Sequence, residues 1–128
     1  MTTTKSFPEI IPEKHPQEIE VWYVIPAIRK ELTLCLINTG KSQREVASLL
    51  GLTEAAVSNY LKKKRAHDIP LPLLAKEFIQ RAALRIQNQR SAYHEIHDIC
   101  TFVKEKKIIC EIHRLVEKNL DLCKVCFE

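Results

Sequence analysis

The chain has 128 residues, of which 45% are hydrophobic and 28% charged, with a formal net charge of +4. This composition indicates one globular domain with an appendage and excludes a chain that is disordered over most of its length. Its longest apolar stretches are too short to cross a bilayer, and its first residues lack the apolar core of a signal peptide, so we expect a cytoplasmic protein with no membrane partner.

Helical periodicity runs through most of the chain, which contains only two glycines and few alternating runs, so we expect an all-α fold. Residues 1–15 are proline-rich without apolar periodicity, which is typical of a flexible arm. A DNA-binding domain is expected over residues 16–66, opening with a helix to Asn38 in which Ile28, Leu32 and Leu36 share one face. Pro26 either kinks this helix or marks the start of its second part.

The segment 42–63 has the pattern of two short helices joined by a tight turn. Ser42 and Glu45 can form a capping box, and Gly51 can end the first helix in a left-handed conformation. Thr53 can cap the second helix, while Val57 and Leu61 anchor that helix inward. This arrangement leaves an outward face of Glu54, Ala55, Ser58, Asn59 and Lys62. Such a small, polar face fits a major groove, where asparagine can pair with adenine.

Three parts of this segment resemble the helix-turn-helix of the Cro and phage-repressor (XRE-like) family: Ser42-Gln-x-x-x-Ala, Gly51-Leu-Thr and Val57-Ser-x-Tyr-Leu. The resemblance implies that Gln43 and Arg44 touch DNA phosphates. It also implies that the groove is lined by Thr53, Glu54, Ala55, Ser58 and Asn59. Lys63 stands where the family often has glycine and can add a phosphate contact. The wider order, with Pro26–Arg29 before the motif and cysteines after it, is similar to a group of small prokaryotic regulators.

The excess positive charge lies in one window, residues 41–65, which has six basic and two acidic residues and leaves the rest of the chain neutral. The basic residues are Lys41, Arg44, Lys62, Lys63, Lys64 and Arg65. A local basic surface suits DNA phosphates, although a solvated lysine run at a helix end is the alternative interpretation. Glu54 repels phosphates, so it should read a cytosine amine or pair with Arg44.

A linker is expected at residues 67–72, because its two prolines cannot continue a helix, and a helical dimerisation and metal-binding tail follows over 73–128. Two apolar stripes predict a helix that runs through residues 72–103, and this helix is our candidate for the dimer interface. The stripes are Leu74, Phe78, Ala82 and Ile86, then Tyr93, Ile96, Cys100 and Val103. A short helix bearing Ile108 and Ile112 precedes the end of the chain.

Four of the five cysteines are concentrated near the end of the chain, at Cys100, Cys110, Cys123 and Cys126. In a cytosolic chain such a cluster favours a metal centre over disulfides. We favour an iron–sulfur cluster over zinc, because four thiolates are present. His113, three residues after Cys110 in the sequence, is the alternative ligand for zinc. A thiol switch of Cys123 and Cys126 is a third interpretation, and buried structural cysteines, as expected for Cys35, are a fourth.

Together these features predict a sequence-specific transcription regulator that binds double-stranded DNA as a homodimer, with a metal or iron–sulfur centre that modulates its activity. The alternative is a helical protein-interaction adaptor with a structural zinc site. No nucleophile–base set and no phosphate loop can be recognised, so we expect neither an enzyme nor a small-molecule substrate.

Overall fold

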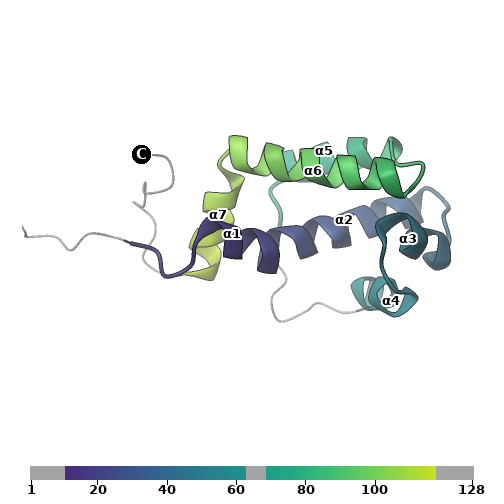
Figure 1. Cartoon of the computed structure of the whole chain (residues 1–128), viewed down its shortest axis with the longest axis horizontal. Helices are drawn as coiled ribbons and strands as arrows, with labels where there is room; N and C mark the ends of the chain where they lie inside the picture. Colours follow the sequence, from purple (N-terminus) through teal and green to yellow (C-terminus); the bar gives the residue numbers. More distant parts are fainter. Residues whose placement is uncertain (1–10, 63–68, 118–128) are drawn as a thin grey trace, which may run out of the picture.

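The computed structural model describes residues 11–62 and 69–117, and within these ranges all regular structure is helical (Figure 1). The expected all-α class is thus confirmed for this part of the chain. The elements are α1 (Pro16–Ile19), a π-helical turn η1 (Glu20–Val24), α2 (Ile25–Asn38), α3 (Gln43–Leu50), α4 (Glu54–Lys62), α5 (Leu73–Leu84), α6 (Gln89–Glu105) and α7 (Ile108–Val116). None of these helices is both long and apolar enough for a bilayer crossing.

The first three elements form one continuous helical stretch around Pro26. Proline has no N–H to donate, and its ring collides with the carbonyl four residues earlier in a regular helix. The turn before it widens accordingly, and the Ile25 N–H donates to the Glu20 carbonyl, five residues back. Of the two outcomes expected at Pro26, the structure shows the second, because the proline lies in the first turn of α2.

Helix α2 is the centre of the fold. It packs against α3 and α4 as well as against α5 and α6, and α4 and the α5–α6 pair lie on opposite sides of it (Figure 1). The side chains of Ile28, Leu32 and Leu36 on its inner face have no exposed surface. Helix α3 also touches α6, where the Gln89 amide nitrogen donates to the Ser48 carbonyl at 2.8 Å.

The expectation of a single helix over residues 72–103 is wrong, because α5 and α6 form an antiparallel hairpin (Figure 1). A capping box starts α6: the Asn88 side chain accepts from the Ser91 N–H at 2.8 Å, and the Ser91 hydroxyl accepts from the Asn88 N–H at 3.0 Å. Across the turn, the Arg85 guanidinium donates two hydrogen bonds to one Glu95 oxygen, at 3.0 and 3.1 Å. Further along, Phe78 and Phe102 stack with their ring centroids 4.1 Å apart.

The hairpin buries part of each predicted apolar stripe, including Ala82 and Val103, but not all of it. Leu74 and Tyr93 are 49% and 74% exposed, whereas Ala75 and Ile79 have no exposed surface. Helix α5 turns its alanines toward α2 and α6 because short side chains let neighbouring helices approach closely. Which face of α5 is buried therefore depends on its neighbours and not on its apolar periodicity alone.

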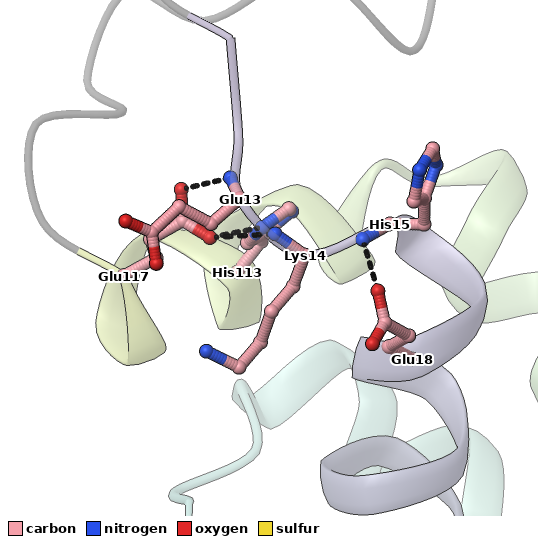
Figure 2. A network of polar contacts seen from close by, with 6 residues as sticks. All are labelled: Glu13, Lys14, His15, Glu18, His113 and Glu117. Atoms are coloured by element: carbon pink, nitrogen blue, oxygen red, sulfur yellow. Dashed lines mark hydrogen bonds and ion pairs between the residues drawn. The ribbon is translucent and has the colours of Figure 1, made fainter.

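The end of α7 is joined to the N-terminal segment by one carboxylate (Figure 2). Glu117 accepts hydrogen bonds from the backbone N–H groups of Glu13 and Lys14, at 2.9 and 3.1 Å, and its other neighbour is the His113 ring nitrogen Nε2 at 3.3 Å. Burial raises the pKa of Glu117, but the backbone donors and His113 outweigh it, and the net pKa is lowered. Part of the expected flexible arm is thus attached to α7.

Candidate nucleic-acid interface

Helix α3 begins with the capping box predicted from the sequence. The Ser42 hydroxyl accepts from the Glu45 N–H at 3.1 Å, and the Glu45 carboxylate accepts from the Ser42 N–H at 2.9 Å. The hydrogen bond from the Ser42 backbone is the main reason that the pKa of Glu45 lies below its ordinary value. The cap fixes the point where the chain enters α3, and it leaves Gln43 and Arg44 exposed on the first turn.

The turn between α3 and α4 depends on the backbone of Gly51. This residue has φ 68° and ψ 34°, a left-handed backbone conformation that residues with a Cβ adopt only at a cost in free energy. Nothing lies within 4 Å of the place where a Cβ would stand, so the glycine is needed for its backbone angles and not for space. The Leu52 N–H donates to the Ala47 carbonyl at 2.8 Å and closes the turn.

Helix α4 buries one face and exposes the other. The Thr53 hydroxyl caps it by accepting from the Ala56 N–H at 3.0 Å. Val57 is fully buried and Leu61 is partly buried, as expected, and Tyr60 joins them with 7% of its surface exposed. The sequence interpretation missed Tyr60, although its position three residues after Val57 could have indicated it.

The side chains predicted to face outward from α4 are exposed or partly buried in the structure. Thr53, Glu54, Ala55, Asn59 and Lys62 are exposed, and Ser58 is partly buried. Among the described residues, neither Glu54 nor Arg44 takes part in an ion pair, so Arg44 does not neutralise Glu54 in the unbound chain. Lys63, Lys64 and Arg65 lie outside the described residues.

Beside the start of α3 is a shallow depression of about 370 Å³. It is lined by Lys41, Arg44, Glu45, Ser48, Leu49 and Gln87. The two cations outnumber the one carboxylate, Glu45, which is engaged in the α3 cap, so the depression suits an anionic group such as a phosphate. Gln87 lies in the turn between α5 and α6. Its position beside α3 was not predicted from the sequence, because the hairpin itself was not expected.

No family model, no curated protein and no solved structure matches this chain. The assignment of a function therefore depends on the geometry described above and on the properties of its residues.

The two described members of the cysteine cluster lie on different helices, Cys100 on α6 and Cys110 on α7, and both are partly buried. Burial first, and the negative charge of Glu20 second, raise the pKa of the Cys100 thiol to about 11, against the opposing effect of Lys104 and Arg29. Cys123 and Cys126 lie outside the described residues, so the geometry of the four predicted ligands together is not described. In the part that it describes, no three His, Cys, Asp or Glu side chains are grouped to hold a metal ion.

His113 is buried and Cys35 is partly buried. His113, the alternative ligand, is 5% exposed and lies against Glu117. Cys35 packs against the core, and burial together with Glu31 raises the pKa of its thiol, which keeps it protonated. This environment agrees with the structural role expected for Cys35.

Proposed function

We propose that this protein is a sequence-specific regulator that binds double-stranded DNA through a Cro-like helix-turn-helix formed by α3 and α4. The observation that carries the proposal is the outward face of α4, where Glu54, Ala55, Asn59 and Lys62 are exposed and the residues between the two ends of the helix are short. A helix with such a face can enter a major groove, because large side chains would hold its backbone away from the base edges.

The contacts fall into two classes. Asn59 is exposed in the middle of α4, where its amide can pair bidentately with adenine. Gln43 and Arg44 on the first turn of α3, with Lys41 and Gln87 beside them, are suited to phosphates. Lys62, Lys63, Lys64 and Arg65 would extend the phosphate contacts beyond the end of α4.

We propose that the regulator acts as a homodimer, since one helix reads too few base pairs for useful specificity. The exposed face of the α5–α6 hairpin replaces the single long helix as the candidate interface. Leu73 and Leu84, 70% and 74% exposed, lie three helical turns apart on the same side of α5. Exposed leucines repeated on one helix face are suited to a partner surface.

For the tail we propose a metal centre held by Cys100, Cys110, Cys123 and Cys126, with an iron–sulfur cluster favoured over zinc. Cys100 and Cys110 lie on the neighbouring helices α6 and α7, and thiolate sulfur is a ligand of both iron–sulfur clusters and zinc. With zinc, His113 could replace one thiolate, and Glu117 would orient its ring. Anaerobic purification with an absorption spectrum and metal analysis tests this directly: iron with sulfide means a cluster, zinc alone means a structural site, and neither rejects both.

The DNA proposal is tested by the binding of a fluorescent random duplex at increasing salt. Each phosphate contact releases counterions, so the logarithm of affinity should fall linearly with the logarithm of salt concentration, with a slope of about −0.9 per contact. Five contacts or so would give a slope of about −4 to −5. No binding at low salt would reject the DNA proposal and favour the protein-interaction adaptor.

A further inference from the structure

A groove of about 410 Å³ lies between α2, α6 and the end of α3, away from the outward face of α4. Its lining is mostly apolar and includes Ile25, Leu50, Ala92, Tyr93 and Ile96. Its volume falls at the lower end of the range for small-molecule sites, which are generally apolar with a few polar groups that orient the ligand.

Arg29 is the cation of this groove. Its side chain lies among the lining residues, and its Nε atom is buried with no hydrogen-bond acceptor. A buried guanidinium N–H without a partner is costly, because water solvates it in the unfolded chain. In the described part of the chain no carboxylate forms an ion pair with Arg29. Glu20 and Arg29 both affect the pKa of Cys100, but the ion-pair partner of Glu20 is Lys104, at 3.1 Å.

We propose that the groove binds a small organic acid whose carboxylate pairs with Arg29 and whose apolar body lies along Ala92 and Ile96. A guanidinium presents parallel N–H donors that match the two oxygens of a carboxylate. The mostly apolar lining favours such an acid over a small hydrated anion such as phosphate, because Gln89, Tyr93 and His97 are the only polar side chains beside Arg29 in the described lining that could replace the water around that anion.

The position of the groove connects the ligand to DNA reading, and this step alone rests on the proposed function. Gly51, the residue on which the α3–α4 turn depends, lines the groove together with Leu49 and Leu50. The hydrogen bond from Gln89 to Ser48 joins α6 to α3 at the same place. An acid bound between α2 and α6 therefore touches the turn before α4. It would act as an effector by changing the conformation of that turn and with it the position of α4.

Binding is tested by two-dimensional NMR on the full chain with hexanoate and 3-phenylpropanoate, compared with hexan-1-ol and 3-phenylpropan-1-ol. Each alcohol has the apolar body of one acid but no carboxylate. Both acids should shift the signals of Gly51, Ala92 and Ile96, and the alcohols should bind at least about tenfold more weakly, as a lost charge-assisted hydrogen bond requires. Equal binding of acids and alcohols, or acids that leave these signals unmoved, would overturn the proposal.

Arg29→Gln removes the charge, and Arg81→Gln is its matched control, because Arg81 is exposed on α5 and does not line the groove. We expect the first variant to bind hexanoate at least about tenfold more weakly and the second to bind as the wild type does. If Arg29→Gln fails to fold, Arg29→Lys takes its place; it should keep acid binding and lose several-fold in affinity, because lysine binds as a point charge. A folded Arg29→Gln that binds hexanoate like the wild type contradicts the proposal.

The same titration with duplex DNA present separates the two proposals. Acid binding without any DNA binding keeps the groove assignment and removes its regulatory role. DNA binding with no acid binding leaves the proposed function and rejects the groove.

Discussion

The two ends of this molecule are held by contacts of very different range. At the α3–α4 end, the capping box joins residues three positions apart, and the turn is closed between Ala47 and Leu52. At the α7 end, Glu117 binds backbone groups of Glu13 and Lys14, more than one hundred residues away in the sequence. The first end is therefore encoded in a short segment, whereas the second exists only once the whole chain has folded.

The largest effect on stability is expected from Gly51→Ala, which tests the contacts at the α3–α4 end. A left-handed backbone costs a residue with a Cβ about 1–2 kcal/mol, and the free energy of unfolding should fall by that amount. Equilibrium denaturation with urea measures it. Gly51→Asn is the control, since asparagine tolerates this conformation and should lose less. Equal losses would mean that the backbone angles of Gly51 are not what stabilises the turn.

A smaller effect is expected from Glu117→Ala, which tests the distant contact. It removes the acceptor of two backbone hydrogen bonds and the neighbour of His113, so stability should fall by about 1 kcal/mol. Hydrogen exchange should speed up at the amides of Glu13 and Lys14, while exchange in α3 stays unchanged. Glu111→Ala, a substitution at an exposed position on α7, should change neither. Protection that survives in Glu117→Ala would show that other contacts hold the N-terminal segment.

The smallest effect is the pH dependence of the α3 cap. The pKa of Glu45 is lowered in the folded chain, so its contribution to stability is complete above its ordinary pKa and is lost as pH falls through the lowered value. Thermal denaturation of the wild type and Glu45→Gln should therefore differ at neutral pH and converge in acid. A difference that stays constant with pH would mean that the Glu45 charge has no part in the cap.

The same contrast explains what could be predicted from the sequence. The cap at Ser42, the left-handed Gly51 and the buried Val57 follow from local rules, and the structure confirms all three. The break between α5 and α6 was missed, although Asn88 and Ser91 together carried a capping signal. Ala82 was correctly expected to be buried on α5, but the burial of Ala75 and Ile79 was not. That burial, the groove at Arg29 and the hydrogen bonds to Glu117 depend on which helices meet in three dimensions.

The central claim, that α4 reads DNA, is tested most directly by selecting duplexes from a random pool with the wild type and with Asn59→Ala. The wild type should enrich a site with two related half-sites about 10 base pairs apart. Asn59→Ala should lose about 1–3 kcal/mol of affinity for that site while binding random duplex as before, whereas Lys63→Ala should weaken both alike. A wild type that enriches no sequence, or an Asn59→Ala variant that enriches the same site with equal affinity, would contradict the account.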